Sequence, residues 1–147
     1  MRRPASLACS AALLLRVTLG ALFLAHLYWK FQMRPGGIHS WWSGLRTQGY
    51  PGVVLGYVLS AEFAGALLLV PGLCTRWVSL YALPFMLGAS HYWLVRKGFF
   101  FTSAGGELPL LWSIGLIVQA MLGDGAYALG SAWISRHGGG DVATVLR

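Results

Sequence analysis

The chain has 147 residues, of which 56% are hydrophobic and only 10% are charged. Soluble domains carry about 25% charged residues, so this chain has too few charges to cover a surface exposed to water. Its mean hydropathy of +0.63 supports the same conclusion. The composition excludes an ordinary soluble enzyme and indicates an integral membrane protein of one domain.

The net charge of +7 comes from 11 Lys and Arg residues against 4 acidic residues. In a soluble protein this excess would suggest a nucleic-acid partner. Here most basic residues stand between apolar stretches, where they would contact lipid headgroups, and no basic helix is present. We therefore expect membrane lipid, and no nucleic acid, as a partner.

The first apolar stretch runs from about Leu7 to Trp29 and is closed by Lys30. It follows a short basic start, as a signal peptide would, but Arg16 interrupts the apolar core that a signal peptide needs. We interpret it as an uncleaved first membrane span that ends in an interfacial aromatic belt.

A polar connection over residues 31–50 follows, and Pro35, Gly36 and Gly37 prevent the helix from continuing. After this break, apolar residues recur at the i, i+3, i+4, i+7 spacing of an amphipathic helix. They are Ile38, Trp41, Trp42 and Leu45. The pattern predicts a short helix that lies in the headgroup layer.

Three more apolar stretches predict three further spans: Pro51–Gly72, Trp77–Val95 with Pro84 inside it, and Glu107–Leu122. The connection after the second span, residues 73–76, is very short, so the third span is expected to return antiparallel beside it. The predicted fold is all-α: a four-transmembrane-helix antiparallel bundle over residues 1–130, with a short interfacial helix between spans one and two. Residues 131–147 are predicted to be a flexible C-terminal tail.

Two opposite charges fall near the middle of the first two spans. Counted from the side of the termini at about 1.5 Å per residue, Arg16 would be ~14 Å deep and Glu62 ~15 Å deep. An unpaired charge at this depth costs several kcal/mol. We therefore predict a core ion pair between Arg16 and Glu62, which either fixes helix register or forms a proton-linked or substrate-binding centre.

A second candidate cluster is expected at the opposite membrane face, formed by His26, Lys30, His91 and Glu107. Two His and a carboxylate could hold a metal ion, and two His on facing helices could ligate haem. The sequence separations are long, so we expect neither haem nor a metal. Hydrogen-bonded polar residues near the interface, or proton exchangers close to a quinone, are the alternatives.

The order of these features resembles the DoxX family of four-helix membrane proteins. The resemblance spans about residues 13–130 and is carried by LLLRVTLGALFLAHLYWK, AEFAGALLLVPGLCTR, His91, GGELPLL and a closing GDG. It implies placement in the bacterial inner membrane with several spans and cytoplasmic termini, a point that the balanced charges of the two sides do not decide. It also implies an association with redox systems, including quinone-linked and sulfur-linked ones.

The leading hypothesis is a membrane subunit or accessory of a redox system for quinone, sulfur or oxidative-stress chemistry, with a redox protein as partner. No cofactor is evident beyond a quinone contact, so the chain would be a non-catalytic subunit of an oxidoreductase. Two alternatives stay open: a solute or proton transporter that works as a homo-oligomer, and a structural assembly factor. No nucleophile motif or phosphate-binding loop favours another enzyme class.

Overall fold

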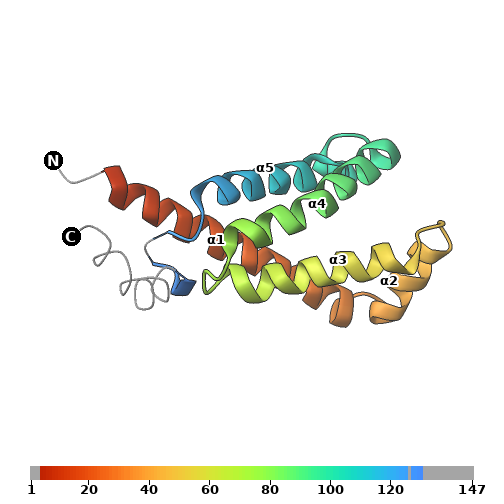
Figure 1. Cartoon of the computed structure of the whole chain (residues 1–147). Coiled ribbons are helices and arrows are strands. Elements are labelled where there is room, and N and C mark those ends of the chain that lie inside the picture. Colours follow the sequence, from red (N-terminus) through yellow and green to blue (C-terminus); the bar gives the residue numbers. More distant parts are fainter. Residues whose placement is uncertain (1–3, 126, 131–147) are drawn as a thin grey trace, which may run out of the picture.

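The computed structural model describes residues 4–125 and 127–130, and these residues fold into helices joined by short turns (Figure 1). The elements in chain order are α1 (Pro4–Tyr28), the π-helix η1 (Trp29–Met33), α2 (Gly37–Arg46), α3 (Gly52–Ala64), the π-helix η2 (Gly65–Leu69), α4 (Thr75–Lys97), the 3₁₀-helix η3 (Phe101–Ser103) and α5 (Glu107–Leu122). The all-α prediction is confirmed for this part of the chain. The tail predicted for residues 131–147 lies outside the described residues.

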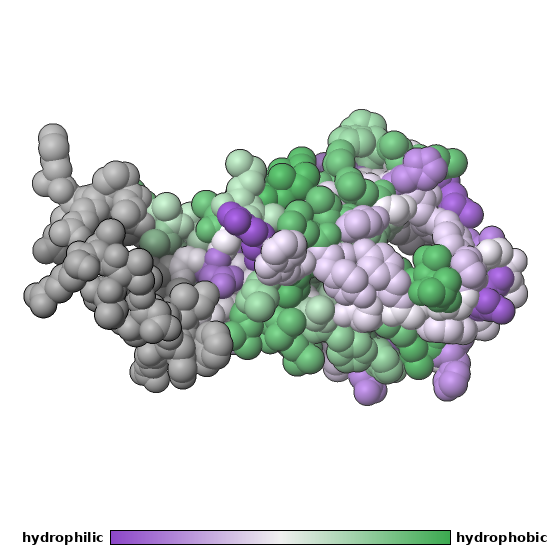
Figure 2. Space-filling model, viewed as in Figure 1, coloured by the Kyte–Doolittle hydropathy of each residue, from purple (hydrophilic) through white to green (hydrophobic). Residues whose placement is uncertain are grey.

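Three helical segments of the described chain are long and apolar enough to cross a membrane: Leu7–Met33, Gly52–Leu69 and Thr75–Lys97. Helix α5 is apolar but has 16 residues, or about 24 Å, against a hydrocarbon core of about 30 Å. Figure 2 shows apolar side chains over the middle of the visible face, and hydrophilic ones gathered at the end formed by α2 and the α4–α5 connection. This distribution is typical of a protein embedded in a bilayer.

Helices α4 and α5 lie side by side, and α1 crosses the molecule to pack against both α5 and η2 (Figure 1). Two glycines allow the close approach of α1 to the second span. A Cβ on Gly65 would lie 2.3 Å from Cδ2 of Phe23, and one on Gly20 would lie 2.6 Å from Cγ2 of Val70. These contacts fix the antiparallel register: Phe23 faces Gly65, and Gly20 faces Val70.

This register lets the start of α1 project beyond the turn between η2 and α4. Arg16 lies at the level of Gly72, since a Cβ on Gly72 would be 1.4 Å from Nη1 of Arg16. About nine residues of α1, or ~14 Å at 1.5 Å per residue, precede Arg16 from Leu7 onward. The equal depths predicted for Arg16 and Glu62 require Leu7 and Gly72 to lie at one level, and in the structure they do not.

Helix α2 has the amphipathic character that its sequence predicts. Its apolar residues are buried or half-buried, whereas His39, Ser43 and Arg46 are exposed. The apolar face packs against η1 and α3. Placement of α2 in the headgroup layer stays a prediction.

The interior of the bundle contains an apolar core and an unusual number of buried polar side chains. The core joins Leu19 and Phe23 of α1 to Leu69 of η2, Ala82 of α4 and Leu116 of α5. The polar residues that are less than a tenth exposed are Arg16, Lys30, Glu62, Thr75, Ser79, Ser90, Ser113 and Gln119. Buried charged groups require partners, and Arg16 and the pair of Lys30 and Glu62 form two separate centres at different levels of the α1–η1 segment.

Candidate functional site

The first centre is a buried ion pair between Lys30 and Glu62. Nζ of Lys30 lies 2.7 Å from both Oε1 and Oε2 of Glu62. Lys30 is 2% exposed and Glu62 is fully buried. Two charges in a water-excluded interior are tolerated only when they neutralise one another with good geometry, and this two-oxygen contact meets that condition.

Both members of the pair stand beside an irregular turn of helix. Lys30 is the second residue of the π-helix η1, and Glu62 comes three residues before the π-helix η2 begins at Gly65. Short π-helical turns are rare and occur often at functional sites, because the extra residue re-aims neighbouring side chains. One such turn contains Lys30 and the other begins three residues after Glu62, which makes this centre the candidate functional site of the described chain.

Helix α2 covers the ion pair through an aromatic contact. The ring centroid of Trp41, a buried residue, lies 4.1 Å from Nζ of Lys30. A cation over an indole face is stabilised by about 0.5–2 kcal/mol, with the larger values at desolvated sites. The predicted interfacial helix thus supplies a third component of the centre.

His26 connects the pair to the surface of the protein. Its Nε2 lies 3.9 Å from Oε1 of Glu62, and its side chain is 44% exposed. His26 and Lys30 are four residues apart, so both project from the same face of the α1–η1 segment. A neutral imidazole carries one proton donor and one acceptor, and His26 lies close to the buried carboxylate without a direct hydrogen bond to it.

The predicted core ion pair of Arg16 and Glu62 is wrong. Because α1 projects beyond the turn at Gly72, Glu62 meets the end of α1 and Arg16 meets the turn itself. Lys30, which the sequence suggested only as a member of the cluster at the opposite face, is the partner of Glu62.

Arg16 instead anchors the segment that follows α5. Its Nη2 donates to the backbone oxygen of Tyr127 at 2.7 Å and its Nη1 to that of Asp124 at 3.4 Å. Oδ1 of Asp124 accepts from the amide and the hydroxyl of Thr75, at 2.7 and 2.6 Å. We call these three residues, with the Tyr127 carbonyl, the Arg16 anchor.

The remaining members of the predicted cluster do not join the Lys30–Glu62 centre. Oε2 of Glu107 accepts from the amide of Phe101 at 2.9 Å, so this carboxylate closes the α4–α5 connection. His91 lies on the exposed part of α4. Within the described residues, no group of three or more His, Cys, Asp and Glu side chains could hold a metal ion.

Sequence reasoning missed three contributors: Trp41, Asp124 and Trp112, whose ring centroid lies 5.8 Å from that of His26. The regular spacing of apolar residues around Trp41 predicted its helix, but it did not reveal the contact of Trp41 with Lys30. Asp124 looked like part of a helix-ending turn. A usable signal was the four-residue spacing of His26 and Lys30, which places both on one helix face.

A comparison with protein-family models matches the DoxX model to residues 11–97, more than half of the chain. The chain belongs to the DoxX family. Family membership and the apolar helices together indicate an integral membrane protein that crosses the bilayer more than once. Neither a search of curated proteins nor a search of solved structures found a match. The matched region contains Arg16, His26, Lys30 and Glu62 but ends before α5.

Proposed function

We propose that this DoxX protein is a membrane subunit or accessory of a redox system, and that the Lys30–Glu62 pair with His26 exchanges protons with a lipid-soluble quinone. The observation that carries the proposal is a fully buried carboxylate, neutralised by Lys30 and in contact with a partly exposed imidazole. Ionisable groups at membrane depth mark proton relays and ligand sites more often than structural contacts.

The chemistry of a quinone can use such a relay. Reduction of a quinone to a quinol takes two electrons and two protons, and the protons must reach the ring from protein groups or water. His26 can take up a proton at the surface of the bundle and deliver it to the quinone, while the carboxylate of Glu62 stabilises the imidazolium that forms in between. Since no electron carrier is evident in the chain, the electrons would come from a partner protein.

The proposal includes a membrane arrangement. The short helix α5 would form the fourth span of an antiparallel bundle in the bacterial inner membrane, with the start of α1 and the end of the chain on the cytoplasmic side. Its length of about 24 Å is enough for a partial span if the bilayer thins locally or neighbouring helices cover its ends.

Purification from native membranes in a gentle detergent tests the function. We expect a redox enzyme and quinone to be recovered with the chain, and the recovered complex to reduce added quinone. A His26→Gln variant should assemble the same complex but reduce quinone at least about tenfold more slowly, in the range for loss of a proton-transfer group. Equal rates for the two complexes would contradict the proton-exchange role.

A second candidate function is proton-coupled transport by a homo-oligomer. The same buried pair supports it, because a buried charge pair can also bind and release a proton that is carried across the membrane. Recovery of the chain alone as a discrete oligomer, with proton flux in proteoliposomes that His26→Gln abolishes, would favour transport over the redox role.

A further inference from the structure

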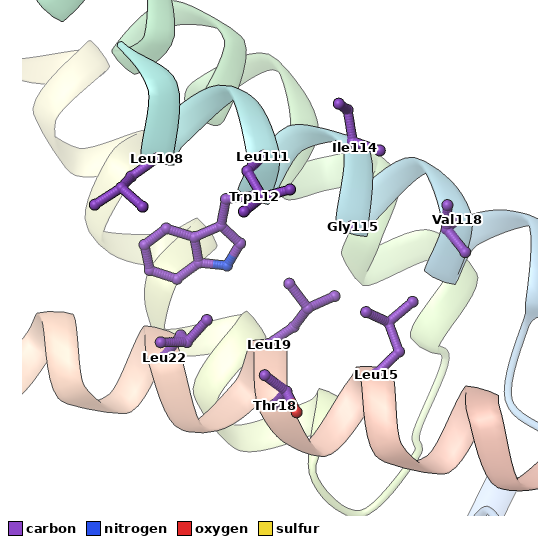
Figure 3. Close-up of a pocket in the computed structure, with 10 residues that line it drawn as sticks. All are labelled: Leu15, Thr18, Leu19, Leu22, Leu108, Leu111, Trp112, Ile114, Gly115 and Val118. Carbon is purple, nitrogen blue, oxygen red and sulfur yellow. The ribbon is translucent and has the colours of Figure 1, made fainter. Parts of the chain in front are cut away.

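An apolar groove of about 430 Å³ runs between α1 and α5 (Figure 3). Leu15, Leu19 and Leu22 line it from α1, and Leu108, Leu111 and Trp112 line it from α5. Its volume lies within the range of about 300–1,000 Å³ that is usual for small-molecule sites. The helices therefore leave room for a narrow apolar molecule between α1 and α5.

The width of the groove depends on a glycine. Gly115 lies on the α5 wall, and a Cβ at this position would be 3.3 Å from Cδ2 of Leu19 on the opposite wall. A larger side chain would therefore extend across the space between the two helices. Gly88 of α4 provides a contrast, because a Cβ there meets no atom within 4 Å.

Trp112 contributes a hydrogen-bond donor without a protein acceptor. Its Nε1 is buried and has no partner in the part of the chain that the structure describes. Figure 3 shows the indole reaching from α5 toward α1, with its nitrogen on the side of Leu19. An unsatisfied buried donor costs about 1–3 kcal/mol, and a ligand in the groove with an oxygen acceptor would remove that cost.

His26 stands at one end of the groove. It follows Leu22 by one helical turn, and its ring meets that of Trp112 edge to face, with centroids 5.8 Å apart. Beyond it, the charges of Lys30 and Glu62 cancel. The residues that line the groove include no cation, and this end offers hydrogen-bond donors and aromatic surfaces, so it suits an uncharged polar group better than a phosphate.

From these four features we infer that the α1–α5 groove binds the hydrocarbon chain of a prenylated quinone and places its ring beside Trp112 and His26, where a ring carbonyl accepts from Nε1 of Trp112. The inference rests on the proposed function and adds to it a location for the ligand and a role for α5. Phospholipid, whose head carries a charged phosphate, is the competing occupant.

The test uses the purified protein in lipid nanodiscs and a prenylated benzoquinone with a photoactivatable group on its chain. We expect crosslinks to map to residues 15–22 and 108–118. Gly115→Leu should reduce labelling by about tenfold, because the new side chain occupies the groove. Gly88→Leu is the matched control, with the same substitution on an open helix face, and should label like the wild type.

The outcomes separate the two proposals. Labelling that survives Gly115→Leu, or that maps to other helices, would overturn the groove while leaving the redox function intact. The absence of quinone labelling in the wild type would overturn both. Competition by phosphatidylglycerol as effective as competition by unlabelled quinone would assign the groove to phospholipid instead. Trp112→Phe, which keeps a ring and removes the donor, should weaken quinone binding by about fivefold.

Discussion

The molecule buries two basic residues at different levels of the α1–η1 segment, Arg16 and Lys30, and the two are held in different ways. Lys30 faces a carboxylate side chain, and both of its contacts depend on the charge of Glu62. Arg16 donates to two backbone carbonyls, whose acceptor strength does not change with protonation. The acceptor that the basic residue meets is titratable in the first arrangement and is not in the second, which is why we assign exchange to the Lys30–Glu62 centre and anchoring to Arg16.

Surroundings reinforce the difference. The Lys30–Glu62 centre is in contact with the partly exposed His26, whose ring meets Trp112 of the groove. The Arg16 anchor is closed by the chain itself, since Leu129 and Gly130 donate backbone hydrogen bonds to Pro71 and Gly72. A responsive site and a fixed joint therefore occupy different levels of one long helix.

The largest effect is expected when one member of the buried pair is removed. Lys30→Met leaves an unpaired carboxylate, and breaking a buried pair from one side costs about 3–5 kcal/mol. We expect a marked fall in the thermal unfolding temperature in detergent. The double variant Lys30→Met/Glu62→Gln, which removes both charges, should recover most of the lost stability while quinone reduction stays low. A double variant as unstable as the single one would contradict charge pairing as the cause.

Removal of the anchor should have a smaller, local effect. Arg16→Met leaves the carbonyls of Asp124 and Tyr127 without their donor, at a cost of about 1–3 kcal/mol. Limited proteolysis should then cut faster near residues 123–130, whereas quinone reduction by the complex should change less than twofold. Comparable loss of activity in Arg16→Met and His26→Gln would remove the distinction between the two centres.

The aromatic cover of Lys30 should contribute less again. Trp41→Leu removes the cation–π contact but keeps an apolar residue of moderate size, and we expect a loss of about 1 kcal/mol. Trp41→Phe, which keeps a weaker ring, should lie between this variant and the wild type in thermal unfolding. Identical stability of all three proteins would show that the ring contributes only as packing.

The smallest effect on stability is expected at His26. His26→Gln keeps both bonds of Lys30 to Glu62, so the unfolding temperature should stay close to that of the wild type. We expect His26→Gln to slow quinone reduction instead, because it removes a proton-exchange group. Measurement of both thermal unfolding and quinone reduction for every variant in this series checks that assignment. A His26 variant that unfolds as readily as Lys30→Met would identify the imidazole as a structural member of the centre.

The sequence predicted the helices well because each depends on local patterns. The i, i+3, i+4 spacing around Trp41 and the apolar stretches around Glu62 are properties of short segments. The partner of Glu62 depended instead on how far α1 slides along the second span. That offset is set by the contact of Gly65 with Phe23, between residues 42 positions apart in the chain, so no local pattern reveals it.

The anchor shows a different limit. Arg16 was correctly identified as a buried charge in need of a partner, but its acceptors are backbone carbonyls, which every residue possesses. Asp124 forms its bonds with Thr75, and in the sequence it stood inside a glycine turn that only marked the end of a helix. Side-chain charges can be matched by inspection of a sequence, whereas carbonyl acceptors cannot.

The two π-helical turns have a consequence for insertions and deletions. Each π-turn holds one residue more than an α-turn, so deletion of one residue within Gly65–Leu69 should restore a regular helix and leave the residues on either side in place. Glu62 would still meet Lys30 and Gly72 would still meet Arg16, whereas insertion of a further residue would turn Gly72 away from Arg16 by about 100°. At η2 the chain should therefore tolerate the loss of one residue better than the gain of one.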